Sequence, residues 1–219
     1  MIIVYTTIFG GSDSLKPAPV GADRCVCFVD NAAEYSGDAH GWELIPWAVS
    51  PMRGPRREAW HLRCIPGALF GHYSAVIWID ASFTLTDLPR LLRHSAGHDL
   101  SGLRHHKRSS CYEEGRELVR IGQSDPDAVA TQLDAYRRAG FRPSALTISC
   151  ILVRTERANL FNLRWDAEVG HAGDNTQLSL DYCAWKSGLV VHHLEGVRKE
   201  NPYATHDHAD HKRRRKPYR

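Results

Sequence analysis

The segment Ala75–Asp80 (Ala-Val-Ile-Trp-Ile-Asp) constrains the fold of this chain more than any other feature. Five apolar residues run without a polar interruption and end at a carboxylate. A continuous apolar run of this length is typical of a central strand covered on both faces, as in the parallel sheets of α/β proteins. Such folds place ligand chemistry at the carboxyl ends of their strands, which is where Asp80 is expected to lie.

Strand-like and helix-like stretches alternate along the rest of the chain. The patterns predict strands over 2–8, 24–29, 42–46, 100–106, 145–154 and 189–193, and helices over 56–69, 88–94, 111–121, 126–139, 155–169 and 177–188. This alternation predicts an α/β domain around a central mixed, mainly parallel sheet flanked by helices. We expect a single domain over residues 1–200 and a flexible, His-rich and basic tail over 201–219.

The composition is that of a soluble globular protein, with 42% hydrophobic and 24% charged residues. No apolar run approaches the roughly 18 to 20 residues that a membrane-spanning helix needs. The N-terminal residues Met1–Tyr5 have no basic region or small-residue cleavage site of a signal peptide. We therefore expect a cytoplasmic protein with no membrane partner.

Basic residues gather at the C-terminus. Residues 211–219 carry six Lys or Arg and no acid, which leaves the rest of the chain with a net charge of about −3. Such a run attracts polyanions through counterion release, although a solvated, solubilising end is an alternative interpretation. A functional run would indicate a nucleic-acid acceptor or partner, contacted through Lys212, Arg213, Arg214, Arg215 and Lys216.

Asp80 needs a partner, because burying an unpaired carboxylate is costly. A metal ion, a cation or a donor-rich ligand would each satisfy it, and the alternative is an aspartate that caps the following turn. Asp80-Ala81-Ser82 matches, with a hydroxyl in place of the second carboxylate, the Asp-x-Asp motif that follows a mid-chain strand in GT-A glycosyltransferases. In those enzymes the motif holds Mg²⁺ or Mn²⁺ against the nucleotide-sugar diphosphate. The Asp-x-Asp-x-Thr motif of haloacid-dehalogenase-type phosphatases also compares with residues 80–84, but it follows the first strand.

Six short motifs follow one another through residues 1–190. They are Tyr5–Asp13, Cys25–Asp30, Gly41-Trp42, Ile77–Ser82, His105–Glu114 and Gln177–Leu180. In this order they resemble the TOD1/MUCI70-like family, formerly a domain of unknown function and now grouped with glycosyltransferases. The resemblance implies a GT-A-like fold and a nucleotide-sugar donor.

The same resemblance implies roles for individual residues. Around the nucleotide it places Thr6, Thr7, Gly10 and Asp30. At the metal and diphosphate it places Asp80 and Ser82. Near the donor sugar or the acceptor it places His106, Glu113 and Glu114.

The catalytic carboxylate is less well defined. Where the family has Arg-Asp-Gln-Leu-Ser, this chain has Asp174-Asn175-Thr176-Gln177-Leu178-Ser179, so the acidic residue stands two positions upstream. The candidates for the general base are Asp174, Asp181, Glu113 and Glu114. Gln177 remains a candidate contact to the donor.

Two further groups complete the expected site. A histidine after the last core strand often completes the metal site of GT-A enzymes, so His192 and His193 are candidates. Side chains alternate along a strand, so only one of them faces inward, and we select His193. Arg53, Arg56 and Arg57 form a basic stretch in which Arg57 is the candidate diphosphate contact, with a solvated surface as the alternative.

The sequence thus predicts a metal-dependent glycosyltransferase. It would move a sugar from a nucleotide-sugar donor to a glycan or to a modified DNA base, using Mn²⁺ or Mg²⁺. The competing hypotheses are a non-catalytic nucleic-acid-binding protein on the same fold and, with less support, a haloacid-dehalogenase-type phosphatase.

Overall fold

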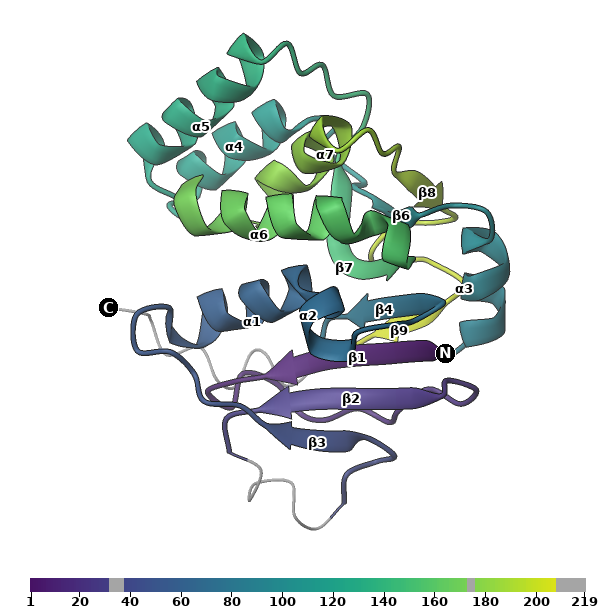
Figure 1. The fold of residues 1–219 in the computed structure, drawn as a ribbon. Coiled ribbons are helices and arrows are strands. Elements are labelled where there is room, and N and C mark those ends of the chain that lie inside the picture. The colour runs from purple at the N-terminus through teal and green to yellow at the C-terminus, as the bar shows by residue number, and fades with distance from the viewer. Residues whose placement is uncertain (32–37, 173–175, 208–219) are drawn as a thin grey trace.

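The structure is a computed structural model that describes residues 1–31, 38–172 and 176–207 (Figure 1). Its strands are β1 (Ile2–Ile8), β2 (Arg24–Val29), β3 (Glu43–Pro46), β4 (Ala75–Ile79), β5 (Phe83–Leu85), β6 (Leu100–Arg104), β7 (Thr147–Arg154), β8 (His192–Leu194) and β9 (Ala204–His206). Its helices are α1 (Gly54–Cys64), α2 (Pro66–Phe70), α3 (Leu88–Ser95), α4 (Cys111–Arg120), α5 (Pro126–Arg138), the 3₁₀ turn η2 (Glu156–Ala158), α6 (Asn159–Ala172) and α7 (Thr176–Lys186).

A seven-stranded sheet in the order β3-β2-β1-β4-β7-β6-β8 forms the centre. Neighbouring strands from β3 to β4 are parallel, β7 is antiparallel to both β4 and β6, and β6 and β8 are parallel. The predicted mixed, mainly parallel α/β sheet is therefore confirmed. The carboxyl ends of β1, β2 and β4 meet at one edge, on the left in Figure 1, and bring Gly10, Asp30 and Asp80 to it.

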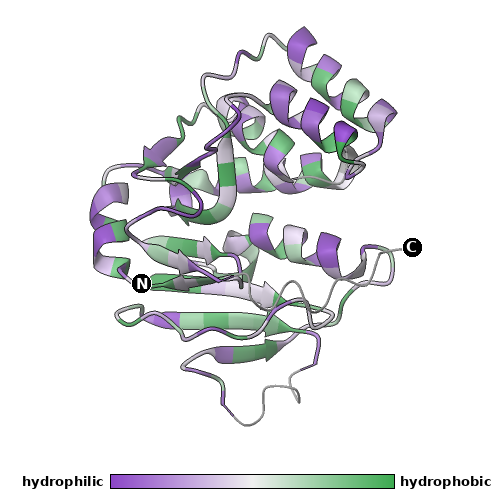
Figure 2. Cartoon of the chain, turned by 180° about the vertical axis from the view of Figure 1, so that it is seen from behind, coloured by the Kyte–Doolittle hydropathy of each residue, from purple (hydrophilic) through white to green (hydrophobic). Residues whose placement is uncertain are grey.

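Hydrophobic clusters cover both faces of the sheet. On one face, Tyr5, Trp78 and Leu152 pack against Phe161 and Trp165 of α6 and against residues of α1 and α7. On the other face, α3, β5 and β9 supply the covering side chains, and α4 and α5 form a third cluster with α7. Figure 2 shows strands that are largely hydrophobic and outer helices that carry both hydrophobic and hydrophilic residues, as expected for helices with one buried side.

A proline divides the helix predicted over 56–69 into α1 and α2. Pro66 has no backbone N–H to continue the first helix, but its fixed φ suits the first turn of the second. The last predicted strand, 189–193, is shorter and lies later in the chain, at His192–Leu194. Within the described residues, no helix has the length and apolar content to cross a membrane.

A two-stranded ribbon of β5 and β9, absent from the sequence prediction, fastens the C-terminal segment beside Asp80. β9 pairs antiparallel with β5, three residues after Asp80. Tyr203 is fully buried, and its carbonyl accepts hydrogen bonds from the backbone N–H groups of Thr86 and Asp87. The folded domain therefore continues beyond residue 200, the boundary expected from the sequence.

Candidate functional site

Asp80 lies at the end of β4, and its partner is an arginine. Its Oδ1 accepts hydrogen bonds from Arg63 Nη2 at 2.8 Å and from Trp78 Nε1 at 2.9 Å. The following turn is closed by the Asp80 backbone carbonyl, which accepts from Phe83 N, rather than by the side chain. No described residue donates to Oδ2, and 28% of the side chain is exposed. One carboxylate oxygen is therefore engaged and the other is open.

Arg63 holds Asp80 from the last turn of α1. Its Nη1 also donates to Ser149 Oγ at 2.6 Å and to Thr176 Oγ1 at 3.3 Å. The guanidinium carbon lies 4.6 Å from the centre of the Trp78 ring, within cation–π range. Of the partners expected for Asp80, this structure contains the cation. Sequence reasoning missed Arg63, because its local helical pattern does not show which strand end its long side chain reaches.

An irregularity in β7 turns polar side chains toward this cluster. Gly102 of β6 pairs with Leu152 but Leu103 pairs with Ile148, so β7 contains extra residues at this point. In a regular strand, odd- and even-numbered residues face opposite sides. Because of the extra residues, the side chains of Thr147 and Ser149 lie on the same face as that of Leu152. Bulges of this kind are common beside active sites, where they redirect side chains.

The ends of β1 and β2 form the second part of the edge. Gly10 N donates to Asp30 Oδ2 at 2.6 Å, so these two predicted nucleotide contacts lie together. Gly10 has a φ of +62°, a conformation that glycine adopts without a steric penalty. A Cβ on Gly10 would lie 3.6 Å from Pro55, so the edge also adjoins the first turn of α1.

Thr6 and Thr7 are both buried near the end of β1 and face opposite sides of the sheet. Tyr5 pairs with Trp78, and the same parallel register places Thr7 beside Asp80. Thr6 Oγ1 is buried and has no hydrogen-bond partner among the described residues. Thr7 is therefore on the Asp80 side, and Thr6 is on the other.

A second cationic side chain, that of Arg198, lies near Cys150, the neighbour of Asp80 on β7. Burial raises the pKa of Cys150 to about 12, and Arg198 lies close enough to oppose this shift. The Cys150 carbonyl accepts from Asp80 N at 2.9 Å, so Arg198 and Asp80 share this neighbour. Arg198 Nε is buried without a partner among the described residues. Sequence reasoning missed this residue, which lies in the loop between β8 and β9.

Asp181 and His193 form a separate chain of hydrogen bonds through Thr147. The two Asp181 oxygens accept from Thr147 N at 2.8 Å and Thr147 Oγ1 at 2.5 Å. His193 Nε2 lies 3.1 Å from the same hydroxyl. Burial raises the pKa of Asp181 to about 6, against the opposing effect of the two Thr147 hydrogen bonds. Such a carboxyl changes its protonation state close to neutral pH.

This structure does not bring His193 to Asp80. His193 lies on β8, three strands away from β4 in the sheet order, which corresponds to about 14 Å at the usual strand spacing. Among the described residues, no three or more His, Cys, Asp or Glu side chains are grouped closely enough to hold a metal ion. Ser82 is buried two residues after Asp80, and its carbonyl accepts from Asp207 N at 3.0 Å.

Glu113 and Glu114 lie at the start of α4, where each has a local partner. Glu113 accepts from Ser109 N at 2.7 Å, while Ser110 Oγ accepts from Glu113 N in the manner of a capping box. The Ser109 hydrogen bonds lower the pKa of Glu113. Glu114 is buried against the Arg108 guanidinium, and burial raises its pKa despite that partner.

The remaining predicted residues are dispersed. His106 is exposed and stacks on His105, with 5.1 Å between ring centres. Gln177 lies half-buried in the first turn of α7. Arg57 is exposed on α1 and lines the cavity described next. Asp174 and the basic run 212–216 lie outside the described residues.

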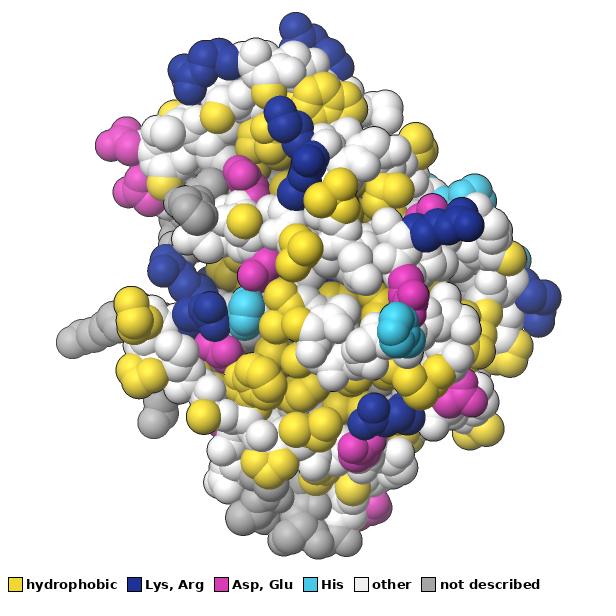
Figure 3. Space-filling view, viewed as in Figure 1, with side chains coloured by type: hydrophobic (Ala, Val, Ile, Leu, Met, Phe, Trp, Pro, Cys, Tyr) yellow, Lys and Arg dark blue, Asp and Glu magenta, His cyan; other side chains and the backbone are white. Residues whose placement is uncertain are grey.

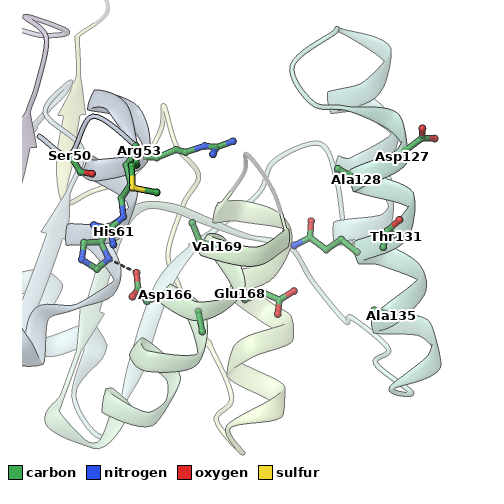
Figure 4. A pocket seen from close by; sticks show the side chains of 15 residues that line it. Ser50, Arg53, His61, Asp127, Ala128, Thr131, Ala135, Asp166, Glu168 and Val169 are labelled. Carbon is green, nitrogen blue, oxygen red and sulfur yellow. Dashed lines mark hydrogen bonds and ion pairs between the residues drawn. The ribbon is translucent and has the colours of Figure 1, made fainter.

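A cavity of about 1010 Å³ opens between α1, α5 and α6 (Figure 4). Within it, His61 Nδ1 lies 2.6 Å from Asp166 Oδ1, a contact drawn as a dashed line in Figure 4. On the surface, Figure 3 shows basic, acidic and histidine side chains beside a hollow on the same side of the molecule as the strand ends. Arg57 is the one predicted site residue among those that line the cavity.

Comparison with known structures supports the fold. The apo structure of WbbM, a bifunctional glycosyltransferase, aligns with 88% of this chain and 38% of its own, at 16% identity and a TM-score of 0.55. The bifunctional IspDF of Campylobacter jejuni aligns with 89% of this chain and 49% of its own, at 10% identity and a TM-score of 0.44. This chain thus spans less than half the length of either protein. The first likeness is evidence of a shared fold, the GT-A-like fold expected from the sequence.

A search of curated proteins finds no match. The family model for the TOD1/MUCI70 glycosyltransferase-like domain, in contrast, matches residues 1–195 and so includes β1 to β8 with Gly10, Asp30 and Asp80, whereas Arg198 and β9 lie beyond it. The chain belongs to the TOD1/MUCI70 glycosyltransferase-like domain family.

Proposed function

We propose that this protein is a glycosyltransferase that takes a sugar from a nucleotide-sugar donor bound at the edge formed by β1, β2 and β4, with a divalent metal ion. The observation that carries this proposal is the convergence of Gly10, Asp30 and Asp80 at that edge, in a chain of a glycosyltransferase-like family. Ligands bind at strand carboxyl ends in related α/β folds.

The charges around the edge suit a diphosphate. Arg63 is already bound to Asp80, Ser149 and Thr176, whereas Arg198 lies near Cys150 with its Nε unpartnered among the described residues. Guanidinium groups bind phosphate oxygens through charge-assisted hydrogen bonds. The backbone at Gly10 is exposed and carries no side chain, so a ligand can approach it closely beside the first turn of α1.

The residues present fit a metal ion whose ligands come mainly from diphosphate and water. Asp80 offers one open oxygen, Oδ2, and Mg²⁺ commonly uses one or two carboxylates together with substrate phosphates. Ser82 is the second candidate ligand. When bound, Mn²⁺ or Mg²⁺ neutralises negative charge on the departing diphosphate. A lone carboxylate binds such an ion weakly, so we expect metal binding to depend on the nucleotide.

Asp181 is one of three predicted general bases that the structure describes, and both its oxygens accept from Thr147. Its raised pKa of about 6 places it in the range in which a carboxylate accepts and returns protons near neutral pH. Glu113 and Glu114 are each held in local contacts of α4. The acceptor is a glycan or a modified DNA base.

Thermal-shift measurements with nucleotide diphosphates test this proposal. UDP, GDP and CDP are added with and without Mn²⁺ to the wild type and to Asp80→Asn. We expect one nucleotide to raise the Tm of the wild type in proportion to the logarithm of its concentration above Kd, and only with Mn²⁺. Asp80→Asn should show little of this rise. No shift with any nucleotide would contradict the enzyme proposal and favour a binding protein on this fold.

A further inference from the structure

The cavity between α1, α5 and α6 lies beside the proposed donor site but has its own lining. Three separate elements contribute to it, and Figure 4 shows Arg53 and Glu168 extending into the space between them. Its volume of about 1010 Å³ is at the upper end of the range for small-molecule sites. Neither Gly10, Asp30 nor Asp80 lines it.

The two regions share structural elements. His61 in the cavity stands two residues before Arg63, whose guanidinium binds Asp80. Asp166 in the cavity follows Trp165, whose Nε1 donates to Thr176 O at 3.0 Å, and the Thr176 hydroxyl accepts from Arg63. The cavity and the Asp80 cluster therefore use side chains from different sides of the same helices, since residues two apart on a helix do not face each other.

The lining has the chemistry of a site for a neutral, hydroxyl-rich molecule. Its charged residues are the arginines Arg53 and Arg57 and the carboxylates Asp127, Asp166 and Glu168, so the cavity has no excess of positive charge. A polyanion such as DNA needs such an excess. Sugars, in contrast, present hydroxyls that both donate and accept, and this lining offers partners of both kinds.

The pair of His61 and Asp166 sharpens this assignment. A carboxylate only accepts, so the 2.6 Å contact fixes the proton of the imidazole on Nδ1. Nε2 is then the ring nitrogen left for a ligand, and no described residue is hydrogen-bonded to it. A hydroxyl of a bound saccharide is a suitable partner, because it can both donate and accept.

We infer that this cavity binds the acceptor and that the acceptor is an uncharged saccharide, with a hydroxyl hydrogen-bonded to His61 Nε2. This inference rests on the proposed function, and it selects the glycan over the DNA base. The charge of the lining distinguishes the two acceptors, because the lining lacks the excess of positive charge that a DNA acceptor would need.

A blocked cavity provides the test. Ala128 lines the cavity and is exposed on α5, so Ala128→Trp fills the space without entering the core. Ala130 is exposed on the same helix and does not line the cavity, so Ala130→Trp is the matched control. Thr131→Trp, also at the cavity wall, serves if Ala128→Trp fails to fold.

Binding of the wild type and of each variant to neutral and anionic oligosaccharides is measured on an array. Binding to a fluorescein-labelled thymidine oligonucleotide is measured by fluorescence anisotropy. We expect the wild type and Ala130→Trp to bind neutral saccharides, and Ala128→Trp to bind them roughly tenfold less tightly or worse, a loss of about 1.4 kcal/mol or more. Binding of anionic probes alone, neutral binding unaffected by Ala128→Trp, or no saccharide binding would each overturn the inference. The thermal shift with nucleotides is evaluated separately. Saccharide binding at the cavity without any nucleotide-induced shift would support the cavity as a saccharide site but contradict the proposed glycosyltransferase function.

Discussion

Removing the Asp80 carboxylate should destabilise the fold as well as affect function, because it leaves Arg63 buried without its counter-ion. Only 10% of the Arg63 side chain is exposed. Breaking a fully buried ion pair by deleting one partner costs about 3–5 kcal/mol. Asp80 retains 28% exposure, so solvent offsets part of this cost, and we expect Asp80→Ala to lower the free energy of unfolding by about 2–4 kcal/mol.

Urea denaturation of four proteins measures this effect: the wild type, Asp80→Ala, Arg63→Met and the double variant. Methionine replaces the guanidinium by an apolar side chain, so the double variant should be more stable than Asp80→Ala, with a coupling of about 1–3 kcal/mol between the two positions. Asp134→Ala, which removes an exposed carboxylate paired with Arg137, should cost no more than about 0.5 kcal/mol.

A loss of less than about 1 kcal/mol in Asp80→Ala would refute this reasoning, as would a double variant no more stable than Asp80→Ala. The prediction also determines which variant suits functional work. Asp80→Asn keeps an oxygen that can accept from Arg63 Nη2 and Trp78 Nε1, so it should remain folded where Asp80→Ala is weakened.

Two further predictions concern Arg198 and Asp181. Arg198→Ala should weaken nucleotide-diphosphate binding, measured by calorimetry, roughly tenfold or more, because it removes one charge-assisted hydrogen bond. Lys199→Ala, which changes the exposed neighbouring residue, should leave the affinity unchanged. Equal effects of the two substitutions would show that Arg198 does not contact the nucleotide. Burial raises the folded-state pKa of Asp181 to about 6, so the folded state binds its proton more tightly than the unfolded chain, and the stability this proton confers is lost as pH rises from about 4 to 6. In urea titrations, Asp181→Asn should abolish this pH-dependent decrease in the free energy of unfolding, which amounts to up to about 3 kcal/mol. A difference in unfolding free energy between wild type and variant that stays constant from pH 4 to pH 7 would contradict this prediction.

Local patterns were sufficient to predict most of the fold. The strand Arg24–Val29 was predicted to the residue, and the helix predicted over 88–94 is α3, which ends one residue later. These features depend on neighbours in sequence. The pairing of β5 with β9 joins segments about 120 residues apart, each only three residues long, and so leaves no periodic signal.

The candidate site was predictable in its location but not in its contacts. The apolar strand ending at Asp80 indicated the edge of the sheet, and the family resemblance placed Gly10 and Asp30 around the nucleotide. The arginine that binds Asp80 comes from a helix whose sequence contains several arginines, and only packing selects Arg63. His61 and Asp166 are 105 positions apart in the sequence, so no local motif predicts their contact.

The most direct measurement of the central claim is release of nucleotide diphosphate from a panel of UDP-, GDP- and CDP-sugars by the folded wild type and by Asp80→Asn. Circular dichroism and thermal unfolding establish that both are folded under the assay conditions. The account predicts release from at least one sugar nucleotide by the wild type, dependent on Mn²⁺ or Mg²⁺, and a loss of most of that rate in Asp80→Asn. Release at the wild-type rate by Asp80→Asn, or no release from any donor, would contradict it.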